Sequence, residues 1–211
     1  MQRIELGVVQ AVAQYAEEVL SQEGFRYASA VVANCKMLAM ELEEQDVGSL
    51  DMDALIIAGY LHDISTETHA FLDHQLKSAE MAVEFLQELD VPAERIKKVE
   101  QAILMHSAAL SAEQRESMSL ESRILYDADR LGRLSGLAVV TALIECGGRY
   151  SNRVVTGEAL TSILRHIEER FVDLYQSLNT APARAMAKTK FGNTLAFLDG
   201  VIEHLSDATP V

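Results

Sequence analysis

The sequence predicts an all-α protein, and three observations support this fold class. Apolar residues recur at spacings of three and four along most of the chain, beginning with the stretch from Ile4 to Val19, and this spacing places them on one face of a helix. Segments that alternate apolar and polar residues are missing, since Val154-Val155 is too short to build a sheet. Hydrophobic residues make up 49% of the 211 residues, enough for a sizeable core. We expect one bundle of about seven to eight helices.

Each helix is expected where an apolar stripe is bounded by residues that start or stop a helix. Gly24 interrupts the first stripe, and Ser49 or Asp51 can cap the third helix. Pro92 suits the first position of a helix, and Gly147-Gly148 suits a C-terminal cap. The expected helices span residues 4–20, 26–44, 52–63, 74–89, 93–106, 120 to the glycine pair, 158–177 and 182–205.

No internal repeat, low-complexity run or long linker divides the chain. We therefore expect residues 1–211 to form a single domain. Its core motifs lie in residues 26–132 and its C-terminal helices in residues 158–205.

The charge balance limits the classes of partner. The chain has 18 basic and 32 acidic side chains, a formal net charge of −14, which repels phosphate backbones and argues against a nucleic-acid polymer as partner. No stretch reaches the ~18–20 uncharged apolar residues of a membrane span, and the start MQRIELGVVQ lacks the features of a signal peptide. Cys35 and Cys146 form no close pair, which fits a reducing cytoplasm. The sequence leaves a homo-oligomer open.

The pair His62-Asp63 ends the apolar segment ALIIAGYLH. Burying an imidazole beside a carboxylate is unfavourable unless both groups are paired, and a divalent cation would pair both at once. The alternative is that the two residues cap the helix end and bond to the backbone.

A second polar feature, Asp127-Ala128-Asp129-Arg130, lies inside an apolar helix. Two aspartates there are unfavourable for helix propensity and desolvation. They point roughly 200° apart, so only one can easily enter a given pocket, and periodicity does not choose between them. The alternative is that one is solvated and the other pairs with Arg130 or Arg133.

Taken together and in order, these motifs resemble the HD-domain superfamily of metal-dependent phosphohydrolases, and most of all its uncharacterised bacterial branch. The resemblance covers nearly the whole chain. It rests on A-G-Y-L-H-D-I at 58–64, H-Q-L-K-S-A at 74–79, H-S at 106–107, L-E-S-R-I-L-Y-D-A-D-R-L-G at 120–132 and T-A-P-A-R-A-M-A-K-T-K at 180–190.

The resemblance implies a divalent metal ion (Mn, Mg, Fe, Ni, Co or Zn) and, as substrate, a nucleotide or another small phosphorylated molecule. It assigns the A-D-x-L aspartate, Asp129, to the metal, whereas Asp127 would either support a metal ligand from behind or lie beside the substrate. His69 is a weaker candidate ligand than the other histidines. The implied metal ligands are His62, Asp63, Asp129, His74 and His106, the catalytic carboxylates are Asp63 and Asp127, and the substrate-binding cations are Arg130 and Lys190.

One departure from the family pattern leaves two functions open. The family's first ligand is a histidine near the start of the second helix, where our alignment places Ala28, and no histidine precedes His62. Gly132 is a further departure, because relatives usually carry aspartate there. Water, His74 or His106 could replace the lost ligand in an active phosphohydrolase. Without a replacement, the metal would bind weakly or be absent at cellular concentrations. The alternative is a catalytically impaired scaffold that binds a small ligand or a protein partner without turnover.

Overall fold

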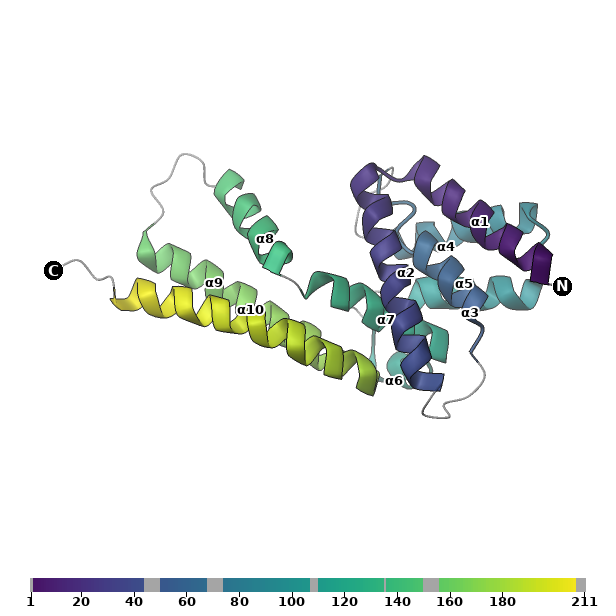
Figure 1. Ribbon diagram of the computed structural model, residues 1–211. Helices are drawn as coiled ribbons and strands as arrows, with labels where there is room; N and C mark the ends of the chain where they lie inside the picture. The colour runs from purple at the N-terminus through teal and green to yellow at the C-terminus, as the bar shows by residue number, and fades with distance from the viewer. Residues whose placement is uncertain are drawn as a thin grey trace. The chain divides into compact units, whose positions relative to one another are not determined.

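The computed structural model describes residues 2–43, 50–67, 74–106, 110–134, 136–149 and 156–207. Within these ranges every regular element is an α-helix, which confirms the predicted all-α class (Figure 1). The chain forms two compact units, Met1–Gly132 and Arg133–Val211. The single-domain assignment stays a prediction. No helix among the described residues combines the length and the apolar composition needed to cross a bilayer.

The first unit is arranged around a buried central helix, α3. Seven of the ten residues of α3 are buried, and α3 packs against α1, α2 and α5, as its apolar composition predicts. Asp51 caps α3, since its carboxylate accepts a hydrogen bond of 3.0 Å from the backbone N–H of Ala54. The helices of this unit are α1 (Gln2–Val19), α2 (Gln22–Glu43), α3 (Met52–Leu61), α4 (His74–Glu88), α5 (Ala93–Met105), α6 (Ala112–Glu116) and α7 (Leu120–Arg133).

The second unit contains α8 (Gly136–Arg149), α9 (Gly157–Gln176) and α10 (Ala181–Asp207). A four-residue connection joins α9 to α10, and the two long helices lie side by side as an antiparallel hairpin (Figure 1). Thr156 caps α9 through a hydrogen bond of 3.2 Å from the backbone N–H of Ala159. Leu164 and Phe171 are the most completely buried large side chains of α9.

The described residues form ten helices, more than the seven to eight that we expected. The predicted loop from 107 to 119 contains α6, which begins with a capping box between Ser111 and Gln114. The predicted long helix is two helices, because α7 ends at Arg133 and α8 begins at Gly136.

Four local expectations were wrong. Gly147-Gly148 lies inside α8 and is no cap, while Gly24 lies in the first turn of α2. Both results reflect the tolerance of a helix for glycine, at roughly 1 kcal/mol each. Pro92 is the N-cap of α5, one residue earlier than expected, and α3 ends at Leu61, with His62 as its C-cap. The candidate cap Ser49 and the candidate ligand His69 lie outside the described residues.

Candidate metal centre

The end of α3 brings His62 and Asp63 to the site. His62 Nδ1 lies 2.9 Å from the carbonyl oxygen of Gly59, in the last turn of α3. Because a carbonyl oxygen only accepts, Nδ1 must carry a proton. In the neutral imidazole the lone pair is therefore on Nε2, which is the atom that faces the carboxylates of the site.

Two further histidines come from helix ends. His74 begins α4 and His106 follows α5 as its C-cap. Ser65 fixes the start of α4, since its hydroxyl donates to the His74 carbonyl oxygen at 3.0 Å and its backbone N–H donates to Ser78 Oγ at 3.2 Å. His106 Nδ1 donates to the carbonyl oxygen of Ile103, so its Nε2 also faces the site.

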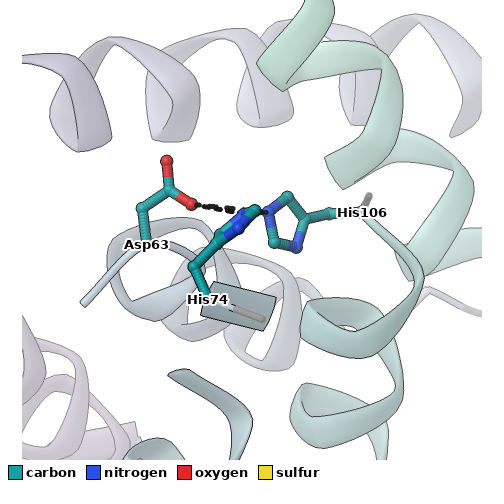
Figure 2. Close-up of side chains that lie close together, drawn as sticks. All are labelled: Asp63, His74 and His106. Atoms are coloured by element: carbon teal, nitrogen blue, oxygen red, sulfur yellow. Dashed lines mark hydrogen bonds and ion pairs between the residues drawn. The ribbon is translucent and has the colours of Figure 1, made fainter. Parts of the chain in front are cut away.

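Asp63, His74 and His106 form a compact group of donor atoms. Figure 2 shows both imidazoles directed at the Asp63 carboxylate. Asp63 Oδ1 lies 3.3 Å from His74 Nε2 and 3.4 Å from His106 Nε2, and the two nitrogens are 3.2 Å apart. These three atoms all lie within 4.8 Å of one another, which is close enough for one cation to contact all three. We call Asp63 Oδ1, His74 and His106 the His74 half of the site.

A second set of donor atoms surrounds the other oxygen of Asp63. Asp63 Oδ2 lies 3.4 Å from His62 Nε2, and Asp129 Oδ1 lies 3.8 Å from the same nitrogen. We call Asp63 Oδ2, His62 and Asp129 the His62 half of the site. Asp63 thus presents one oxygen to each half.

Asp129 is held by its neighbours on α2 and α7. The Tyr27 hydroxyl lies 2.7 Å from Asp129 Oδ1 and 3.0 Å from the Asp129 carbonyl oxygen. Arg130 Nη1 lies 3.5 Å from Asp129 Oδ2 and donates to the His106 carbonyl oxygen at 3.1 Å. The Arg130 guanidinium also stacks on Tyr126, with Cζ 3.4 Å from the ring centroid. The aspartate and the loop after α5 are therefore joined through Arg130.

Neighbouring charges shift the pKa values of the buried His62 and Asp63 in opposite directions, and both shifts favour the charged form. Burial alone would lower the pKa of His62, but the neighbouring Asp63 carboxylate, with Asp129, raises it to about 9. Burial likewise opposes ionisation of Asp63, but the neighbouring His62 and His106 imidazoles hold the pKa of Asp63 well below its ordinary range. An ionised carboxylate therefore lies between imidazoles that are 0% (His62) and 1% (His106) exposed.

The residues fit a divalent cation. His62 Nε2 and Asp63 Oδ1 are buried, and neither has a hydrogen-bond partner of adequate geometry among the residues that the structure describes. A buried polar atom without a partner is unfavourable, typically by ~1–3 kcal/mol. Imidazole nitrogens and carboxylate oxygens converging on one space are the donors that Zn, Fe, Co, Ni and Mn accept. A cation would satisfy both atoms and would replace the proton on His62.

The other predicted site residues differ in their surroundings. Asp127 is completely buried on α7, while Lys190 is exposed on α10 of the second unit, and their roles stay predictions. Ala28 is buried in α2, and its alignment with the family's first histidine stays a prediction. The α2 side chain seen in contact with Asp129 is its neighbour, Tyr27.

Sequence reasoning missed Tyr27, although a signal was present. Tyr27 and Asn34 are polar residues seven positions apart, which places them on one face of α2, the face that carries the buried Val31 and Leu38. Asn34 donates to the carbonyl oxygen of Ala128 at 3.2 Å, so both polar residues are bonded to α7.

Comparison with solved structures shows the fold. An HD-superfamily hydrolase from Bacillus thuringiensis is 20% identical, with a TM-score of 0.67, and the match covers 97% of this chain and 98% of that one. Bacillus subtilis YpgQ, solved in complex with ADP, is 18% identical with a TM-score of 0.70, over 95% and 96% of the two chains. A predicted HD-superfamily hydrolase from an uncultured Thermotogales bacterium is 20% identical with a TM-score of 0.61, over 92% and 91%. None of the curated proteins matches this chain.

The family model described as HD domain matches residues 28–134, which is more than half of the chain and contains both halves of the site. The chain therefore belongs to the HD-domain family.

Proposed function

We propose that this HD-domain protein is a metal-dependent phosphohydrolase that acts on a nucleotide or another small phosphate ester. The observation that carries the proposal is the convergence of His74 Nε2 and His106 Nε2 on Asp63 Oδ1, with that oxygen and His62 Nε2 buried and without hydrogen-bond partners among the described residues. Binding of a cation is the simplest way to offset the unfavourable burial of these unpartnered atoms.

Divalent cations would be held by His62, Asp63 and Asp129 in one half and by Asp63, His74 and His106 in the other. When bound, a cation of this kind polarises a phosphoryl oxygen and lowers the pKa of water, which makes phosphate-ester hydrolysis accessible near neutral pH. The overall reaction adds water across a P–O bond, giving a phosphate and an alcohol or a shorter nucleotide.

The protein's own residues prepare this space in three ways. Backbone carbonyls of Gly59 and Ile103 fix the imidazoles of His62 and His106, so that each directs Nε2 inward. The low pKa of Asp63 keeps its carboxylate ionised throughout the neutral range. Arg130, stacked on Tyr126, fixes Asp129 relative to the loop after α5, and its guanidinium is our candidate for contacting a phosphate oxygen.

The proposed substrate class rests on charge and on one relative. A chain with a net charge of −14 repels phosphorylated molecules unless cations lie at the site, and the group of Asp63, His74 and His106 can bind such cations. YpgQ, which shares the fold, has been solved with ADP. A nucleoside phosphate is therefore the first substrate to test.

The test is a phosphate-release assay on purified protein with nucleoside mono-, di- and triphosphates, each with Mn, Mg, Co, Ni or Zn. We expect cation-dependent hydrolysis that His106→Gln reduces by 100-fold or more, on the order of one lost ligand. His166→Gln, an exposed histidine of α9, is the matched control and should leave the rate unchanged.

The scaffold alternative predicts a different outcome. A protein that binds cations or nucleotides tightly and releases no phosphate under any of these conditions would favour it. A protein that binds no divalent cation at all would overturn the metal centre itself.

A further inference from the structure

The side chain of Tyr27, on α2, contacts the Asp129 carboxylate on α7. Its hydroxyl lies 2.7 Å from Asp129 Oδ1, which is the oxygen 3.8 Å from His62 Nε2. A carboxylate oxygen has two lone-pair positions, so a donor on one leaves the other directed at the His62 half. The phenol therefore selects the orientation in which Oδ1 faces the site.

A second observation shows that the space for this ring is built into α7. A Cβ added at Gly132 would lie 3.1 Å from Tyr27 Cε2 and 3.2 Å from the Tyr27 hydroxyl oxygen, closer than nearly all real Cβ contacts. Glycine at 132 lets the ring approach the helix closely, three residues after Asp129. Asn34, two turns along α2, holds the same two helices together through the Ala128 carbonyl oxygen.

We propose that Tyr27 is a positioning residue for Asp129, seated on Gly132, and that the affinity of the His62 half for a divalent cation depends on its hydroxyl. The proposal rests on the metal centre of the proposed function. It adds that Tyr27 and Gly132 act as a pair, because the glycine makes room for the ring whose hydroxyl orients the ligand.

The donor atoms of the His62 half, where Tyr27 and Gly132 act, differ from those of the His74 half. The donors around His62 and Asp129 are one imidazole nitrogen and carboxylate oxygens, supported by a phenol, whereas the His74 half has two imidazoles and one carboxylate oxygen. An oxygen-rich set suits Mn or Mg better than Zn, Co or Ni, which favour imidazole.

The test is calorimetric titration of the full-length protein with Mn²⁺ for wild type, Tyr27→Phe, Gly132→Ala and the double variant. Tyr27→Phe keeps the ring and removes the hydroxyl, so we expect the Mn²⁺ dissociation constant to rise by about 10-fold to 100-fold, as for other partners of metal ligands. Gly132→Ala displaces the hydroxyl and should weaken binding in the wild-type background. It should add nothing in the Tyr27→Phe background, because the two changes act through one bond.

Tyr60→Phe is the matched control. Tyr60 lies two residues before His62 and stacks on Phe25 with centroids 6.2 Å apart, and its hydroxyl has no hydrogen bond to any of the residues that the structure describes. Its variant should bind Mn²⁺ as the wild type does. A Tyr27→Phe protein with an unchanged dissociation constant, or additive effects in the double variant, would overturn the positioning role alone. A wild-type protein that binds no Mn²⁺, Co²⁺ or Zn²⁺ would overturn the proposed function and this proposal with it.

Discussion

The two compact units bury different kinds of side chain. In the first unit, buried residues include three histidines, Asp127, Asp129 and Arg130, most of them in one cluster. In the second, the buried polar side chains among the described residues are two threonines, Thr180 and Thr194. Thr180 and Thr194 bond to nearby backbone, Thr180 to the Ala183 N–H and Thr194 to the Lys190 carbonyl.

This contrast separates the parts of the chain that serve stability from the part that serves chemistry. Buried charge is unfavourable unless it is compensated, so a fold that retains it in one place has a use for it there. The second unit follows the ordinary rule of apolar burial and local capping. We therefore expect that disturbing the packing of the second unit leaves cation binding unchanged, whereas removing a charge from the cluster of the first unit alters it.

The largest expected effect comes from removing the carboxylate shared by both halves. Asp63→Asn leaves the shape nearly unchanged, but it removes the charge from both halves and replaces the acceptor oxygen of one half by an NH₂ group that only donates. We expect metal content and phosphate release to fall below detection, a larger loss than the ~10–100-fold typical for partners of ligands. Metal analysis of the purified protein measures it. Retained metal in Asp63→Asn would show that the ion lies elsewhere.

The next effect tests whether stability and binding separate between the units. Phe171→Ala removes a buried ring of α9 that contacts Phe191 with centroids 6.5 Å apart, and should reduce the free energy of unfolding by about 3–5 kcal/mol. Cation affinity of the folded protein should remain at the wild-type value. Denaturant unfolding and calorimetry measure the two quantities, and a joint loss would show that the second unit supports the metal centre.

Metal removal should act through the first unit. A ligand that binds only the folded state adds about 2.7 kcal/mol at a free concentration 100 times its dissociation constant. Dialysis against a chelator should therefore lower the melting temperature, and added Mn or Co should restore it. In Asp63→Asn, added cation should leave the melting temperature unchanged. A rise in melting temperature as large as that of the wild type would contradict the assigned ligands.

The smallest effect concerns a capping residue outside the cluster. Asp51→Ala removes the acceptor for the Ala54 N–H and for Arg95 Nε, at 3.1 Å, and should reduce stability by about 1 kcal/mol. Burial opposes ionisation of Asp51, but the Ala54 N–H and the Arg95 guanidinium lower its pKa. Because the folded pKa lies below the unfolded one, this stabilisation is present at neutral pH and is lost as the pH falls through the folded pKa.

The free energy of unfolding of wild type and Asp51→Ala, measured from neutral to acid pH, checks the direction of this pH dependence. The difference between the two proteins should shrink as the pH is lowered. Asp51→Asn, which keeps an acceptor for the Ala54 N–H, should lose less stability at neutral pH than Asp51→Ala. An unchanged difference at low pH would contradict the role of the ionised carboxylate.

Much of the fold could be predicted because apolar periodicity reports burial directly. The helix around Ile56 and Ile57 was identified from its composition alone, and it is central. The division between α7 and α8 could not be predicted, since apolar residues continue through Leu134 to Val140 and the pattern contains no proline. The short α6 was missed although Ser111 and Gln114 carry the spacing of a capping box.

The site was predictable in its residue types and not in its geometry. Motif order could nominate His74 and His106, but a distance of 3.2 Å between their Nε2 atoms depends on where α4 and α5 begin and end. The spacing of Tyr27 and Asn34 marks a polar position on an apolar face of α2, but it could not identify the partner of Tyr27, which lies 102 residues away. Long-range contacts of this kind carry no local pattern.

Ser65 also anchors the start of α4 through hydrogen bonds that do not involve the residues between Ser65 and His74. The Ser65 hydroxyl donates to the His74 carbonyl oxygen and its backbone N–H donates to Ser78 Oγ. These two bonds close a loop between Ser65 and the start of α4. Closing a longer ring costs only about 0.6 kcal/mol for each doubling of length. The imidazole of His74 is consequently anchored from the end of α3, by hydrogen bonds to Ser65 that a longer connection would leave in place.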